Sequence, residues 1–257
     1  MTTPSPIQLR LPSEGPGPQI TQLYPYVELL SEGAPPSNSL FILEPARVAL
    51  GLDAPGDRLL VIDPPADLTA RFRLPTESAL LSCAAPLESH LPQVQHIPGG
   101  VAHIRLGDQY LDIYSYSGGA IVHLPPLGVV YSGGFGSDLL PPTIAADSDG
   151  VAELDTLRLL ARLLKQQRIR LLIPHVGNMC TDLPTMMGRL AADVAYLHHL
   201  RRILPAVAIA QNVAAPDPVL VESLLPAERR SDFARRSHAQ NVERLLTTLL
   251  RQKASSA

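Results

Sequence analysis

The sequence predicts an α/β or α+β sandwich in which the faces of the sheets are covered by helices. Short apolar or alternating runs, broken by glycine and proline, follow one another from about residue 20 to residue 133. Helical patterns and one further strand follow them, and this order is typical of layered folds. The 257 residues, 46% of them hydrophobic, are enough to bury a sizeable core.

The expected strands are segments of three to six residues that are mostly aliphatic or aromatic and are bounded by turn formers. They are residues 40–43, 47–52, 59–62, 79–81, 102–106, 110–114, 120–124, 129–131 and 169–173.

Three helices are expected, at residues 151–167, 183–204 and about 227–252. The first has leucines on one face and follows Ser148 and Asp149, which are typical capping residues. Its acidic first turn is explained by the helix dipole. Residues 206–210 and 219–221 are too short to assign.

The predicted organisation has three parts: a mobile arm at 1–18, rich in proline, a layered domain at 19–205, and a C-terminal extension at 206–257. The terminal helix of the extension carries Val242, Leu245 and Leu246 on one face, which packs either on the domain or on a second subunit. A homodimer is therefore one possible assembly. His238 and Asn241, three residues apart on the same helix, are expected to be surface or interface polar residues.

Composition narrows the classes of partner. The net charge is −3, with Lys and Arg scattered, so no surface is built to follow a phosphate backbone and nucleic acid is not an expected partner. No apolar run approaches the roughly 20 residues needed to cross a bilayer, and no leader pattern is present, so we expect a cytoplasmic protein without a membrane partner. Cys83 and Cys180 are too few for a disulfide framework.

Five stretches of the chain have the strand and turn motifs of one enzyme family. They are residues 38–56, 78–88, 106–119, 124–134 and 171–177. In this order they resemble motifs of the metallo-β-lactamase superfamily, over roughly residues 20 to 205. The resemblance implies a four-layer αββα sandwich and places the buried structural aspartate of the family at Asp53.

The same resemblance implies that the metal ligands of the family are replaced. In the stretch 78–88, Cys83, Ala85 and Glu88 stand at the ligand histidines, and Leu87 stands at the metal-binding aspartate. Further along, Ser115 or Tyr116 replaces a histidine, Gly134 replaces the bridging aspartate, and Val176 replaces the last histidine, with His175 one residue early. Alanine, leucine, glycine and valine side chains have no lone pair for a metal, so no cofactor is expected.

Two hypotheses follow. The first is a pseudoenzyme or binding protein without a metal, whose partner is an unknown small molecule or protein. The second is a hydrolase of ester, thioester or phosphoester substrates with a mononuclear zinc or iron site of unusual composition, because Cys, Glu and His are competent ligands. Its metal ligands would be Cys83, Glu88, His90 and His175. A metal-free hydrolase that uses Cys83 with a nearby histidine is a third possibility.

Candidate residues of the cleft expected from the family are the replaced positions and their polar neighbours, namely Cys83, Glu88, His90, Tyr116, Gly134, Asp138 and His175. A structural interpretation competes with each: Cys83 as a small buried filler, Glu88 and His90 as loop residues, and His175 as a cap or a partner of a loop carbonyl. The glycines at 133–136 indicate a turn and not a phosphate-binding loop, because no P-loop lysine follows.

Overall fold

In the computed structural model the arrangement of the chain is described for residues 18–44, 58–84, 89–95, 97–107, 109–211 and 222–255. Ten strands of these residues form two sheets of five. The first sheet has the order β1 (Gln19–Tyr24), β2 (Val27–Glu32), β3 (Ser37–Glu44), β4 (Arg58–Ile62) and β5 (Glu77–Leu81). Its neighbours are antiparallel, except for the parallel pair β4 and β5.

The second sheet runs in the reverse order of the chain. Its strands are β10 (Leu171–Pro174), β9 (Val129–Gly133), β8 (Gly119–Leu124), β7 (Gln109–Tyr116) and β6 (Val101–Leu106). Only β9 and β10 are parallel, and the chain between them forms a helix, as a parallel crossover requires. Both sheets are therefore mixed.

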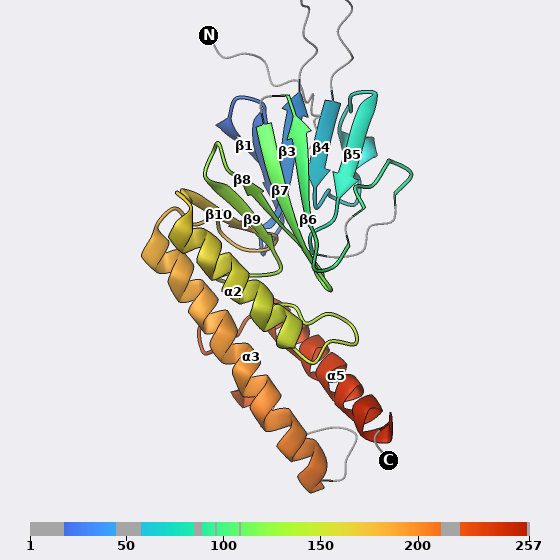
Figure 1. Ribbon diagram of the computed structural model, residues 1–257, viewed down its shortest axis with the longest axis vertical. Helices are drawn as coiled ribbons and strands as arrows, with labels where there is room; N and C mark the ends of the chain where they lie inside the picture. The colour runs from blue at the N-terminus through green and yellow to red at the C-terminus, as the bar shows by residue number, and fades with distance from the viewer. Residues whose placement is uncertain are drawn as a thin grey trace, which may run out of the picture.

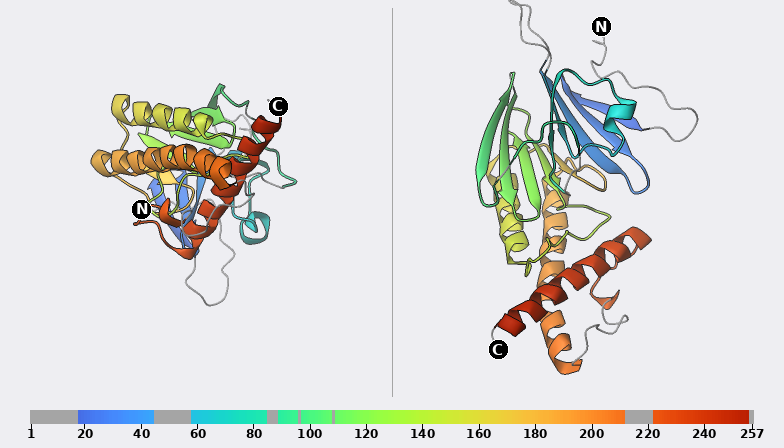
Figure 2. Two further views of the ribbon diagram at one scale, coloured as in Figure 1. Left: turned by 90° about the horizontal axis from the view of Figure 1, so that it is seen from below. Right: turned by 90° about the vertical axis from the view of Figure 1, so that its right-hand side faces the viewer.

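The two sheets lie face to face with helices outside them (Figure 1, Figure 2). The short helix α1 (Leu68–Arg71) covers the outer face of the first sheet. The helices α2 (Val151–Gln166), α3 (Leu183–Gln211) and α5 (Asp232–Ser255) lie on the side of the second sheet, and α5 crosses α3. This arrangement confirms the predicted α+β sandwich with four layers. None of the described helices has an apolar stretch long enough to cross a bilayer.

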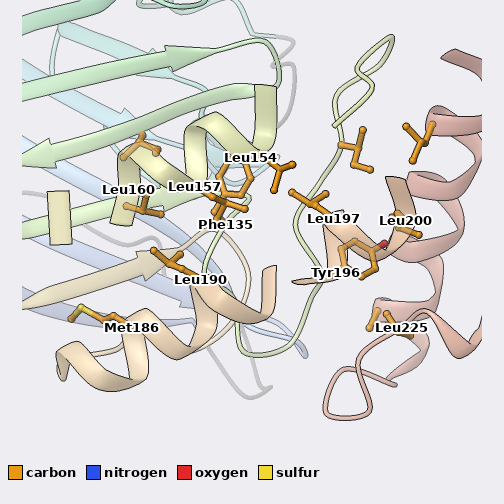
Figure 3. Packing of buried hydrophobic residues seen from close by; sticks show 14 of the residues in the cluster. Phe135, Leu154, Leu157, Leu160, Met186, Leu190, Tyr196, Leu197, Leu200 and Leu225 are labelled. Carbon is orange, nitrogen blue, oxygen red and sulfur yellow. The ribbon is translucent and has the colours of Figure 1, made fainter. Parts of the chain in front are cut away.

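Three apolar clusters correspond to the three spaces between the layers. Aliphatic residues of both sheets fill the middle space, among them Ile42, Ile62 and Ile113, each 0% exposed. A smaller cluster lies under α1, and the largest joins the second sheet to α2, α3 and α5. Figure 3 shows side chains of α2 and α3 meeting Phe135 in that largest cluster.

Most expected elements lie at or close to their expected positions, and the exceptions have local causes. The strands β1 and β2 have no counterpart among the expected segments; β1 is an edge strand whose first four residues are exposed, so its sequence is not apolar. The helix α3 continues through Pro205 to Gln211, so residues 206–210 are helical. Residues 1–17, the expected strand at 47–52 with Asp53, and residues 219–221 lie outside the described residues.

The start of α2 differs from the expected cap. The capping residue is Gly150 in the left-handed region, with φ of 86°, and not Ser148 or Asp149. Ser148 instead donates to Oε2 of Glu153 at 2.6 Å, and the backbone N–H of Ala145 donates to Oε1 at 2.8 Å. Because Glu153 is fully buried, these hydrogen bonds, more than the helix dipole, account for this acidic residue.

The prediction that His238 and Asn241 are surface or interface residues is wrong, because they are 2% and 1% exposed. Nδ1 of His238 lies 2.9 Å from the hydroxyl of Tyr196, to which Nδ2 of Asn241 donates at 3.1 Å. Asn241 also donates to the carbonyl of Pro142 at 2.8 Å and accepts the backbone N–H of Ile144 at 2.9 Å. Tyr196, His238 and Asn241, here called the Tyr196 cluster, thereby attach α5 to α3 and to the loop after β9.

A buried ion pair makes a second attachment of the C-terminal segment. Arg229, just before α5, donates to Oδ1 of Asp193 in α3, and both side chains are almost completely buried. Oδ2 of Asp193 accepts the backbone N–H of Gly136 at 2.7 Å. Burial raises the pKa of Asp193 to about 6 although Arg229 acts to lower it. The glycine-containing turn after β9 is therefore held from the side of α3.

Candidate functional site

Asp63, directly after β4, is buried at the end of the sheets where the candidate residues were expected. Its φ of 47° lies in the left-handed region, which aspartate tolerates better than most residues. Oδ1 accepts the backbone N–H groups of Cys83 at 2.6 Å and Ala84 at 3.2 Å. The carboxylate therefore holds the chain that leaves the neighbouring strand β5.

The other carboxylate oxygen of Asp63 faces Tyr131 and His175. Oδ2 lies 3.0 Å from the hydroxyl of Tyr131 and 3.3 Å from Nδ1 of His175. The same hydroxyl lies 3.2 Å from Nδ1 of His175 and 2.7 Å from the backbone oxygen of Asn38. Asp63 and His175, which directly follow β4 and β10, thus meet Tyr131 from the middle of β9, and the three are here called the Asp63 cluster.

Cys83 is completely buried and borders the Asp63 cluster through its backbone. Burial, with a smaller effect of the nearby Asp63, raises the pKa of its thiol well above the ordinary value. Its carbonyl accepts the backbone N–H of Ala120 at 3.2 Å. This approach requires glycine at position 119, because a Cβ there would lie 1.8 Å from the carbonyl oxygen. The expectation that Cys83 is a small buried filler agrees with this position, and both cysteines are free.

Tyr116, at the end of β7, directs its side chain towards Cys83. Its hydroxyl donates to the carbonyl of Cys83 at 3.4 Å, and the nearby backbone N–H of Gly134 acts to lower its pKa. Its ring packs on Phe135, with 5.2 Å between the ring centroids. Burial has the larger effect and raises the pKa of Tyr116 far above the ordinary value, so the hydroxyl stays protonated. Three of the matched ligand positions, Cys83, Tyr116 and Gly134, therefore lie next to one another.

Gly134 and Asp138 differ in how they meet their surroundings. A Cβ at Gly134 would find its nearest neighbour, Oγ1 of Thr143, at 3.5 Å, so a side chain has room there. Asp138 accepts hydrogen bonds from the backbone and side chain of Asn178 at 2.9 and 2.8 Å, and Arg189 lies 3.6 Å away. Burial acts to raise the pKa of Asp138, but these partners lower it. The carboxylate thus connects the loop after β9 to the loop after β10 and to α3.

The remaining candidates do not join this group. His90 is exposed, and Glu88 lies outside the described residues. His175 has its backbone N–H on the carbonyl of Gly133 at 2.8 Å, while its ring contacts the side chains described above and not a loop carbonyl. Among the residues for which the structure is described, no three His, Cys, Asp or Glu side chains are placed to hold a metal ion.

Asp63 and Tyr131 are site residues that the sequence alone does not mark. Asp63 ends an apolar run, residues 59–62, as Asp53 follows another at 47–52. The pairing of the strands distinguishes Asp63 as the aspartate of the site. Because β4 pairs in parallel with β5, Asp63 lies beside Cys83. Tyr131 lies inside an apolar strand, and nothing in its neighbours signals a buried hydroxyl with polar partners.

A separate hollow of about 590 Å³ runs along the outer side of α2. It is lined by Asp155, Arg158, Ala161, Arg162 and Lys165. None of the candidate residues belongs to it, so it adds nothing to the site at the strand ends.

Neither a protein-family model nor a curated protein matches the sequence. Among solved structures, a stereoselective inverting sec-alkylsulfatase from Pseudomonas sp. is similar with a TM-score of 0.52 and 9% identity, over 90% of this chain and 50% of the other. A metallo-β-lactamase from Pontibacter korlensis has a TM-score of 0.44 and 12% identity over 68% and 99% of the two chains. A metallo-β-lactamase from Erythrobacter litoralis has a TM-score of 0.45 and 16% identity, over 72% of this chain and 94% of the other. The chain is therefore similar in fold to the sec-alkylsulfatase, and its two sheets with flanking helices agree with the αββα sandwich that the sequence resemblance implies.

At these identities the similarity is one of fold. Chemistry has to be argued from the residues present, because one fold carries unrelated functions. In this αββα sandwich the residues at β4, β9 and β10 form the Asp63 cluster, with Cys83 and Tyr116 beside it.

Proposed function

We propose that this chain is a metal-independent protein of the metallo-β-lactamase fold that acts by binding a small molecule or a protein. The observation that carries the proposal is the position of Tyr116. Its hydroxyl donates to the carbonyl of Cys83 and lies close enough to the backbone N–H of Gly134 for that group to lower its pKa. A side chain that lies between these positions occupies space that a metal ion with its ligands would need.

The chemistry of the available donors supports the same conclusion. A zinc or iron site needs at least three protein ligands with free lone pairs. The thiol of Cys83 is buried and its raised pKa disfavours the thiolate that binds metals. Nδ1 of His175 faces Tyr131 and Asp63, so Nε2 is the ring nitrogen that remains as a metal ligand. These described residues do not fit the dinuclear centre of the family.

A hydrolase with a mononuclear site is the second candidate, and one observation favours it. Cys83 and His175 adjoin the same carboxylate, one through its backbone N–H and the other through its ring. With Glu88 as a third ligand, a zinc or iron ion would have a donor set that is known for these metals.

Calorimetric titration with zinc and with iron(II), after dialysis against a chelator, distinguishes the two candidates. The wild type is compared with Cys83→Ala, His175→Ala and the control His198→Ala, whose histidine is exposed on α3. Circular dichroism verifies that each variant is folded. We expect weak binding that is the same in all four proteins. Tight binding with one ion per chain, lost in the first two variants and kept in the control, would establish the hydrolase instead.

A further inference from the structure

The hydrogen bonds of the Asp63 cluster determine which nitrogen of His175 carries its proton. The hydroxyl of Tyr131 has one hydrogen to donate. The hydroxyl has two oxygen neighbours, the backbone carbonyl of Asn38 at 2.7 Å and Oδ2 of Asp63 at 3.0 Å. Both can only accept a hydrogen bond, because neither a carbonyl nor a carboxylate oxygen has a proton. The hydroxyl hydrogen is therefore used by an oxygen atom, whichever of the two receives it. None is left for the imidazole ring.

Nδ1 of His175 faces the same two side chains, with the Tyr131 oxygen at 3.2 Å and Oδ2 of Asp63 at 3.3 Å. If Nδ1 had a lone pair, it would face two acceptors at hydrogen-bonding distance without a hydrogen between them. A proton on Nδ1 satisfies both contacts at once. Tyr131 does not change this count by ionising, because burial and the nearby Asp63 raise the pKa of its hydroxyl well above the ordinary value.

The buried side of the ring thus carries Nδ1, and the exposed part of the side chain lies on the other side. The side chain of His175 is 29% exposed, whereas that of Asp63 is 4% exposed. We propose that Asp63 and Tyr131 fix His175 as the Nδ1–H tautomer, so that Nε2 is a proton acceptor facing solvent and forms a binding site for a small molecule with a hydroxyl or amine donor. An aspartate behind the ring favours this tautomer as it does in other Asp–His pairs.

This inference rests on the proposed function, because a metal ion on Nε2 would also place the proton on Nδ1. The ligand chemistry follows from the charges. The carboxylate behind the ring disfavours a bound anion on its far side, whereas an O–H or N–H group can donate to the lone pair of Nε2. The neighbouring Asp138 is already used by Asn178 and Arg189. Nε2 is therefore the acceptor that the Asp63 cluster offers to a ligand.

The tautomer is measured directly by long-range proton–nitrogen correlation NMR on ¹⁵N-labelled full-length protein. The sample is dialysed against a chelator, its metal content is checked, and the spectrum is taken at about pH 8, where an ordinary imidazole is neutral. We expect His175 to show Nδ1–H, and the exposed His198 and His199 to show the Nε2–H form that a free side chain prefers. Nε2–H at His175 in the metal-free sample would overturn the inference. Metal that stays bound after dialysis would instead overturn the proposed function.

The reactivity of Nε2 gives a second readout, with diethyl pyrocarbonate as the probe. The nitrogen lone pair attacks one carbonyl carbon, the bond to the ethyl carbonate group breaks, and the proton on Nδ1 is released towards Asp63. Mass spectrometry follows the rate at each histidine. Asp63→Asn should lower the rate at His175 several-fold and leave His198 and His199 unchanged. Tyr131→Phe, which keeps Asp63 as an acceptor, should preserve the tautomer. Equal rates at His175 in the wild type and a folded Asp63→Asn would contradict the role of Asp63; if that variant does not fold, the wild-type tautomer decides.

Discussion

The Asp63 cluster and the polar contacts of the C-terminal segment are both buried networks, but they differ in what they leave accessible. In the Asp63 cluster one member, His175, reaches solvent, and the other polar groups serve to orient it. The Asp193–Arg229 pair and the Tyr196 cluster are closed on all sides and join α3, α5 and the loops after β9. The first network leaves the ring of His175 partly exposed, as the proposed binding of a ligand requires, whereas the second holds elements together. Changes in the second should therefore act on stability, and changes in the first on binding.

The largest loss of stability is expected from Arg229→Ala. The change leaves the carboxylate of Asp193 buried without its counterion, which costs about 3–5 kcal/mol in comparable sites. The loss should shrink at lower pH, because the raised pKa of Asp193 lets it take up a proton and become neutral. Urea unfolding at two pH values measures both effects. Arg230→Ala, at an exposed neighbouring position, is the control and should change little.

Gly119→Ala should destabilise the chain by about 3 kcal/mol, the upper end for an added methyl group in a packed interior. The new Cβ would lie 1.8 Å from the carbonyl oxygen of Cys83, so the end of β8 has to move. Thermal unfolding measures the effect. Gly188→Ala in α3, where a Cβ has no neighbour within 4 Å, should instead stabilise slightly, because alanine favours a helix. Similar losses in both variants would contradict the described approach of β8 to Cys83.

Asn241→Ala tests the Tyr196 cluster and should cost about 2 kcal/mol, because it leaves buried partners without hydrogen bonds. The adjacent Gln240 is exposed, and Gln240→Ala should be close to neutral. Both are read by urea unfolding. A neutral Asn241→Ala would mean that the hydrogen bonds of Asn241 do not contribute to holding α5.

His123 gives the smallest expected effect, which appears as a pH dependence. Burial lowers the pKa of this side chain, although Asp112 acts to raise it. The unfolded chain therefore takes up a proton first as the pH falls below about 6.5, and stability declines there by at most about 1.4 kcal/mol per pH unit. His123→Gln should flatten this decline between pH 7 and pH 5. His103→Gln, at an exposed partner of the same Asp112, should leave it intact.

The sequence predicted the layers better than the site, and particular residues explain why. Strands and helices follow from apolar periodicity, which is a local property. The Asp63 cluster depends on contacts of Tyr131 with residues that lie 68 and 44 positions away in the sequence, so its members could not be recognised before the strands were paired. Cys83, Tyr116 and Gly134 were identified because the motifs of the family include their positions. The contacts between these residues could not be predicted from the motifs.

The C-terminal helix shows the opposite limitation. Its apolar face was identified from spacing, and Val242 and Leu245 pack within the chain as part of the largest cluster. His238 and Asn241 resemble a solvated face because helical spacing does not reveal a buried partner such as Tyr196. A polar residue can be assigned to the surface only when the element that might cover it is known. The homodimer considered from the same face stays a prediction.

The metal content of the protein tests the central claim most directly. The full chain is produced in medium supplemented with zinc and iron, purified without chelators, and analysed by inductively coupled plasma mass spectrometry. Because Tyr116 is bonded to the carbonyl of Cys83 beside Gly134, and His175 is bonded to Asp63 and Tyr131, we predict far less than one ion per chain. One or two tightly bound zinc or iron ions per chain would contradict the account.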